Sequence, residues 1–136
     1  MKYRFLDEIR SDVMFEAYGK SLKELFQNAA EALSSVICKV GKVSPKEAVD
    51  VEVKADDLDH LMINWLQEII AAVDTEQKFF SKFEVDDATD NHLKARIYGE
   101  SIRPELGETV VKAVTLFKFK LEKTKKGYIT RVSLDI

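Results

Sequence analysis

The spacing of apolar residues changes near the middle of the chain, and this change limits the folds that are open to it. Between residues 21 and 73, two long stretches repeat apolar residues at the three- and four-residue spacing of an amphipathic helix. From Lys78 onward, apolar and polar residues alternate, which is the period of strands with one buried face. Helices followed by a strand-rich half predict an α+β fold.

Each predicted helix has its own start signal. Ser21 and Glu24 have the spacing of a capping box, in which a hydroxyl and a carboxylate satisfy free backbone amides. The apolar face that follows comprises Leu22, Leu25, Phe26, Ala29, Ala30, Leu33, Val36 and Ile37. Asp56 or Asp57 can cap the second helix, whose apolar face comprises Leu58, Leu61, Met62, Trp65, Leu66, Ile69, Ile70 and Val73. We interpret Trp65 as a core residue because it lies on this face.

Alternation predicts the strands, which we expect at residues 13–17, 49–53, 79–85, 93–99, 117–121 and 132–136. Gly127 is the expected turn of the last hairpin. Phe117 and Phe119 alternate with lysines, so we expect both rings to face the core. The sequence therefore predicts two amphipathic helices packed on a mostly antiparallel β-sheet, in a single domain over residues 1–136.

Composition indicates the kind of partner and the cellular compartment that suit the chain. A net charge of −3 argues against wholesale wrapping of nucleic acid. Cys38 is the only cysteine, which excludes an intramolecular disulfide and favours a reducing compartment. The longest apolar run, residues 69–73, is far shorter than the roughly 20 residues of a membrane span. We therefore expect a cytoplasmic protein that makes no contact with a membrane.

The common catalytic signatures are missing from the sequence. Its five glycines form no phosphate-binding loop, and one cysteine and two histidines form no zinc-binding pattern. A serine or cysteine nucleophile needs a nearby base, and we interpret His60 and His92 as ordinary surface residues. We therefore predict no catalytic residues and no enzymatic activity for this chain.

The last hairpin is rich in lysine, with side chains at Lys118, Lys120, Lys123, Lys125 and Lys126. One interpretation is a solvated edge strand whose charges discourage aggregation. The alternative is a contact surface for RNA or for a protein.

Asp12 and Asp135 are candidate metal ligands. Asp12 precedes a predicted strand on the face opposite Val13, and Asp135 alternates with Leu134 and Ile136 at the end of another. If these aspartates and the terminal carboxylate of Ile136 converge, they form a hard oxygen site suited to calcium or magnesium. The alternative is that Asp12 caps a turn and that Asp135 is solvated.

The order of motifs resembles the archease family, whose members assist the tRNA-splicing RNA ligase. The resemblance runs over nearly the whole chain and includes Trp65-Leu66-Gln67-Glu68-Ile69-Ile70, followed by Asp74-Thr75-Glu76. The chain also ends on the Asp-Ile of the family, here Asp135-Ile136. The other matching segments are residues 7–12, Ala17-Tyr18-Gly19, Asn28-Ala29-Ala30, Phe80-Ser81-Lys82-Phe83, Tyr98-Gly99-Glu100 and Val111-Lys112-Ala113-Val114-Thr115. Two departures are Ile9, where the family commonly has histidine, and Leu116-Phe117, where it commonly has Tyr-His.

The resemblance implies an archease-like fold and an accessory role. Such a protein promotes guanylylation of an RNA ligase and its multiple turnover in tRNA splicing, while the covalent chemistry and the RNA contact belong to the ligase. It also implies a divalent metal ion, calcium or magnesium, held by Asp12, Asp135 and the terminal carboxylate of Ile136. Two alternatives keep the acidic cluster structural: a chaperone-like protein-interaction module, and a weak RNA-binding protein that uses the hairpin lysines.

Overall fold

A computed structural model describes residues 1–7 and 12–136 of the chain. The helices are α1 (Leu22–Ile37) and α2 (Leu58–Glu76), and two short 3-10 helices are η1 (Val40–Lys42) and η2 (Pro104–Leu106). The strands are β1 (Tyr3–Leu6), β2 (Asp12–Gly19), β3 (Glu47–Lys54), β4 (Lys78–Ala88), β5 (His92–Ser101), β6 (Ala113–Thr124) and β7 (Gly127–Asp135).

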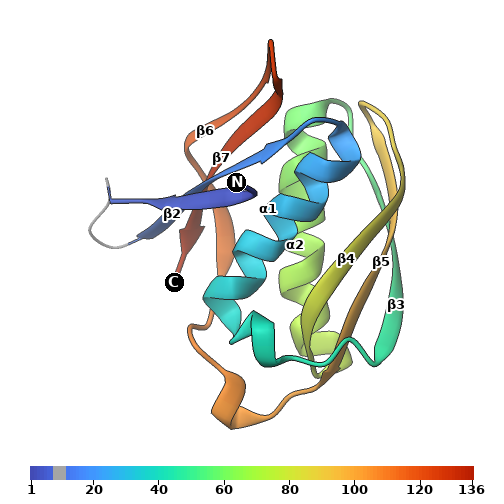
Figure 1. Cartoon of the computed structure of the whole chain (residues 1–136), viewed down its shortest axis with the longest axis vertical. Helices are drawn as coiled ribbons and strands as arrows, with labels where there is room; N and C mark the ends of the chain where they lie inside the picture. The colour runs from blue at the N-terminus through green and yellow to red at the C-terminus, as the bar shows by residue number, and fades with distance from the viewer. Residues whose placement is uncertain (8–11) are drawn as a thin grey trace.

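The strands form two sheets, and every strand pair within them is antiparallel. One sheet has four strands in the order β1-β2-β7-β6, and the other has three in the order β3-β5-β4. The helices lie between these sheets (Figure 1), with α1 in contact with β2 and β4 and α2 in contact with β3 and β6. The predicted α+β class with two packed helices is therefore confirmed. The alternation pattern did not reveal that the strands divide into two sheets.

Both helices begin where the sequence predicts. The Ser21 hydroxyl accepts a hydrogen bond of 3.2 Å from the Glu24 amide, and the Glu24 carboxylate accepts one of 3.3 Å from the amide of Lys20. Of the two candidate caps for α2, Asp57 is the one used, because its carboxylate accepts from the His60 amide at 2.8 Å. None of the helices in the described part of the chain is long and apolar enough to cross a membrane.

The layer of helices supplies the centre of the core. Trp65 has no exposed surface, which confirms it as a core residue. Its indole N–H donates a hydrogen bond of 3.0 Å to the carbonyl oxygen of Phe26, so α2 is tied to α1 by a polar contact inside an apolar environment. Residues from both sheets, such as Phe15 and Ile97, are equally buried against the helices.

Strand β6 contains a bulge that overturns one expectation. Thr115 pairs with Ser133 and Lys120 pairs with Arg131, so β6 advances five residues while β7 advances two. The backbone of Lys118 has a positive φ of 52° within this bulge, defined here as residues 116–119. Because the bulge interrupts the alternation, Phe117 is 52% exposed and the prediction that it faces the core was wrong. Phe119 does pack against the core.

Candidate metal site

The register of two strands brings together the predicted metal ligands that lie within them. Asp12, the first residue of β2, is the direct cross-strand partner of Asp135, the last residue of β7. Partners of this kind have Cβ atoms about 4.5–5.5 Å apart on the same face of the sheet. Like charges placed directly opposite each other are unfavourable unless something compensates them. The pair therefore has the spacing and the charge to attract a cation.

The end of β7 is held on both sides. Asp135 is paired with Asp12 on one side and with Ala113 on the other, and its carbonyl oxygen accepts a hydrogen bond of 2.8 Å from the Lys112 amide. Ile136 follows directly and is 40% exposed. The carboxylate of Ile136 therefore lies one residue beyond Asp135, whose cross-strand partner is Asp12.

Other side-chain ligands are scarce. Among residues 1–7 and 12–136, no three or more His, Cys, Asp and Glu side chains are grouped so that they could hold a metal ion. Within the described residues, the chain terminus could supply further oxygen to a cation between Asp12 and Asp135, and water could complete its coordination. The donors present are all oxygens, which suits the hard cations calcium and magnesium.

A buried hydroxyl lies on the next rung of the same face. Thr115 and Ser133 are cross-strand partners; Thr115 lies two residues after Ala113 and Ser133 two residues before Asp135, and side chains two apart in a strand share a face. The Ser133 hydroxyl donates a hydrogen bond of 2.9 Å to the carbonyl oxygen of Phe117, so the bulge lies over this rung. The Thr115 hydroxyl oxygen is buried without a hydrogen-bond partner. An unpartnered buried oxygen beside the aspartate pair fits a polar ligand at this end of the sheet.

Further along the same face, a third carboxylate is already compensated. Glu16 accepts hydrogen bonds from Arg4 at 3.0 Å and from the Tyr18 hydroxyl at 2.9 Å. Burial disfavours its charged form, but these hydrogen bonds outweigh burial and lower the pKa of Glu16. Glu16 therefore has hydrogen-bond and ion-pair partners. Among the described residues, the side chains of Asp12 and Asp135 have no such partners.

The other residues singled out from the sequence do not join the site. His60 pairs with Asp57 at 2.8 Å at the start of α2, and His92 pairs with Glu52 at 2.6 Å on the three-stranded sheet. Leu116 and Phe117 lie on the exposed bulge. Ile9 falls outside the described residues. Sequence reasoning missed the Thr115 hydroxyl and the bulge, because neither has a signal in the alternation of side chains.

Comparison with known proteins places this arrangement in a wider group. The sequence model of the Archease protein family matches residues 3–136. "Protein archease" of Methanosarcina acetivorans is 38% identical over 141 aligned residues, which cover 99% of this chain and 96% of that protein. "Protein archease" of Archaeoglobus fulgidus is 36% identical, and the match covers 100% of both chains.

A solved structure has the same fold. The solution structure of Methanobacterium thermoautotrophicum protein 1598 superposes with a TM-score of 0.80 and 32% sequence identity. The superposition covers 98% of this chain and 98% of that one.

Proposed function

Because the chain belongs to the archease family, we propose that it activates an RNA ligase of tRNA splicing, by promoting guanylylation and multiple turnover of that ligase. Membership of this family supports an accessory role in RNA processing. In the proposal, the ligase carries out the covalent chemistry and brings the RNA, and the present chain contributes a divalent cation site.

The cross-strand pairing of Asp12 with Asp135 is the observation on which the proposal rests. Repulsion between two carboxylates held opposite each other destabilises the folded state unless a cation offsets it. We propose that Asp12, Asp135 and the terminal carboxylate of Ile136 hold calcium or magnesium.

A bound divalent cation would supply a Lewis acid that polarises a phosphate oxygen. The contribution of this chain is to hold the aspartates in place before the partner arrives. The central position of β7 fixes the backbone of Asp135, and pairing with β7 fixes that of Asp12. Such preorganisation removes the need to order flexible carboxylates when the cation binds.

The decisive experiment is multiple-turnover RNA ligation by the RNA ligase of the same organism, with and without this protein. We expect the protein to increase the number of ligations per ligase molecule. Asp12→Asn and Asp135→Asn should each remove most of this increase, and a short extension beyond Ile136 should do the same by removing the terminal carboxylate. Asp90→Asn is the matched control, because it removes one negative charge from an exposed turn of the other sheet.

A second readout follows the metal without the ligase. Calcium or magnesium added to the metal-free protein should raise its melting temperature, because a ligand that binds only the folded state stabilises it. The same addition should leave Asp135→Asn unchanged and should stabilise Asp90→Asn as it does the parent protein. Full stimulation of the ligase by the Asp12→Asn and Asp135→Asn proteins would exclude the metal site from the activity.

One observation favours a second candidate function, a chaperone-like protein-interaction module. Leu116 and Phe117 are 69% and 52% exposed on the bulge, and neighbouring apolar side chains in water are typical of protein contacts. This candidate predicts ligase stimulation that persists in excess chelator and is lost in a Leu116→Ser, Phe117→Ser protein. Stimulation that requires the metal would argue against it.

A further inference from the structure

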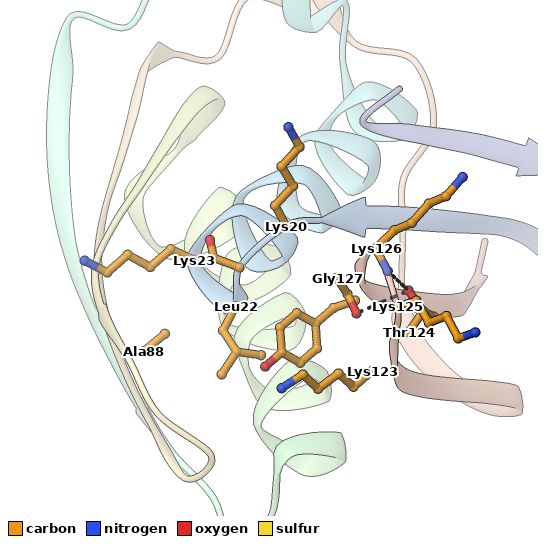
Figure 2. Close-up of a pocket in the computed structure, with 11 residues that line it drawn as sticks. Lys20, Leu22, Lys23, Ala88, Lys123, Thr124, Lys125, Lys126 and Gly127 are labelled. Carbon is orange, nitrogen blue, oxygen red and sulfur yellow. Dashed lines mark hydrogen bonds between the residues drawn. The ribbon is translucent and has the colours of Figure 1, made fainter.

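An open hollow lies at the opposite end of β7 from the aspartate pair. It has a volume of about 600 Å³ and lies between the β6–β7 hairpin tip and the start of α1. Five of its eleven lining residues are lysines, and none is acidic. We call this surface the basic hollow; its lysines are Lys20, Lys23, Lys123, Lys125 and Lys126. Figure 2 shows these lysine side chains spread around the hollow and extending in different directions.

The lysines of the basic hollow form no ion pairs with the described residues. All five lysines are exposed. Lysines elsewhere do pair, such as Lys2 with Glu31 at 3.0 Å and Lys78 with Glu47 at 3.7 Å. Five like charges are therefore concentrated on a chain whose net charge is −3.

A close backbone contact joins the two segments that supply these lysines. Gly127 follows the turn of the hairpin with a φ of +136°, a conformation that side-chain-bearing residues rarely adopt. A Cβ atom at this position would lie 2.3 Å from the carbonyl oxygen of Gly19 and 2.9 Å from the Cα atom of Lys20. The absence of a side chain thus lets Lys125 and Lys126 lie beside Lys20 although they are distant in sequence.

We propose that the basic hollow binds the phosphate backbone of RNA directly, without the ligase. Lysine binds phosphates as a compact, strongly hydrated point charge, and several lysines spread around an open surface match a chain of separate phosphates. The residues make no base-specific pattern, so the binding should be largely independent of sequence.

The composition of the hollow favours RNA over an acidic protein. The central parts of protein–protein interfaces are enriched in aromatic residues and arginine and depleted in lysine. The hollow has the reverse composition, with five lysines, no arginine and a single aromatic ring, that of Tyr128. Lys123 already lies over this ring, at 5.8 Å from its centroid.

The test measures the affinity of the full protein alone for a fluorescently labelled single-stranded RNA over a range of salt concentrations. If all five lysines contact phosphates, log K should fall with log salt at a slope of about −3.5. This slope corresponds to a loss of affinity of roughly a hundredfold between about 50 and 200 mM salt. RNA that fails to bind at the lower salt concentration would overturn the proposal.

Two double variants distinguish the effect of the basic hollow on RNA affinity from the effect of overall net charge. Lys125→Gln with Lys126→Gln removes two charges at the hairpin tip, whereas Lys42→Gln with Lys46→Gln removes two exposed charges near η1. We expect the first pair to bind RNA about 25-fold more weakly near 0.1 M salt, with a slope shallower by about 1.4, and the second to bind as the parent does. Equal weakening by both pairs would overturn the proposal, as would tighter binding of poly-glutamate than of RNA.

The assay contains no ligase, so this inference and the proposed activation can fail separately. Asp12→Asn, which removes the proposed metal ligand, should leave RNA affinity unchanged because Asp12 lies at the other end of the sheet. Gly127→Ala should weaken RNA binding through displacement of the hairpin, although it removes no charge. RNA affinity that falls in Asp12→Asn but not in Lys125→Gln with Lys126→Gln would place the RNA at the aspartate pair and overturn the proposal.

Discussion

Charges are arranged differently on the outer face of the three-stranded sheet and at the two ends of the four-stranded sheet. On the three-stranded sheet, charges of opposite sign face each other across the strands: Arg96 lies between Asp50 and Glu84, and Lys94 between Glu52 and Asp87. Arg96 also pairs with Asp86 at 3.1 Å. Cross-strand pairs of this kind stabilise a sheet modestly.

The four-stranded sheet keeps charges of one sign together at each end. Asp12 faces Asp135 at one end, and the lysines of the basic hollow gather at the other. A surface that only needed solubility could intersperse its charges, as the three-stranded sheet does. The difference indicates that the three-stranded sheet serves the fold, whereas the ends of the four-stranded sheet are suited to ligands from outside the chain.

The largest effect should come from the layer that the two sheets share. Trp65→Ala removes a fully buried ring and should lower the free energy of unfolding by about 3–5 kcal/mol, as measured by urea unfolding. Trp65→Phe is the control that keeps most of the volume and loses the hydrogen bond to Phe26. A loss below about 1 kcal/mol in Trp65→Ala would mean that the helices do not hold the sheets through this residue.

Substitution of one glycine in each sheet should show which sheet takes part in RNA binding. A Cβ atom on Gly99 in the three-stranded sheet would lie 1.9 Å from the carbonyl oxygen of Phe79, so Gly99→Ala should cost about 1–3 kcal/mol. Gly127→Ala should cost a similar amount because of its backbone conformation. Measured at a temperature where both remain folded, only Gly127→Ala should weaken RNA binding. Weakening by both would remove the distinction between the sheets.

Acid should lower the stability of the protein partly through Glu16, the carboxylate on the four-stranded sheet that pairs with Arg4 and Tyr18. The folded-state pKa of Glu16 lies below its ordinary value of 4.5, so its stabilising contribution is present above that pH and is lost as the pH falls through the lowered value. Glu16→Gln should cost about 1 kcal/mol at neutral pH and should depend less on pH below 4.5 than the parent protein does. Urea unfolding across this pH range measures both effects, and parallel curves would show that Glu16 is not stabilised by Arg4 and Tyr18.

The smallest effect should have the opposite sign. In the presence of chelator, Asp12→Asn should stabilise the protein by about 0.2–1 kcal/mol, because it removes a like charge from the position opposite Asp135. Thermal unfolding of this variant beside Asp90→Asn measures the difference. Destabilisation of Asp12→Asn by more than the control would mean that Asp12 has a favourable partner in the metal-free protein.

Local signals in the sequence predicted both α-helices and strands β2 to β7, but not strand β1. The cap at Ser21, the cap at Asp57 and the buried face around Trp65 depend on residues close in sequence, and all three are present. The division into two sheets depends on which strands pair over long distances, and alternation is the same for either arrangement. The exposure of Phe117 depends on extra residues in one strand relative to its neighbour, which a single strand cannot reveal.

The candidate sites were predictable to different degrees. The positions of Asp12 and Asp135 at strand ends singled them out as candidates, and the resemblance to a family implied the same pair. The register that places them opposite each other is a property of the folded sheet. Lys123, Lys125 and Lys126 were visible as a basic hairpin, but their neighbours Lys20 and Lys23 come from a segment about a hundred residues earlier. The pairing of Gly19 with Tyr128 and the close contact at Gly127 bring the two groups together.

Strand β7 also fixes the distance between the basic hollow and the aspartate pair. It runs from Gly127, at the basic hollow, to Asp135, and its pairing with β2 has no irregularity along the way. At a rise of about 3.4 Å per residue, it sets the two ends of the sheet about 27 Å apart. Removal of two residues from β7 would shorten this interval by about 7 Å and keep Asp135 on its face, whereas removal of one would turn Asp135 toward the helices. A partner that binds at both ends of the sheet would therefore bind less well if the length of β7 changed.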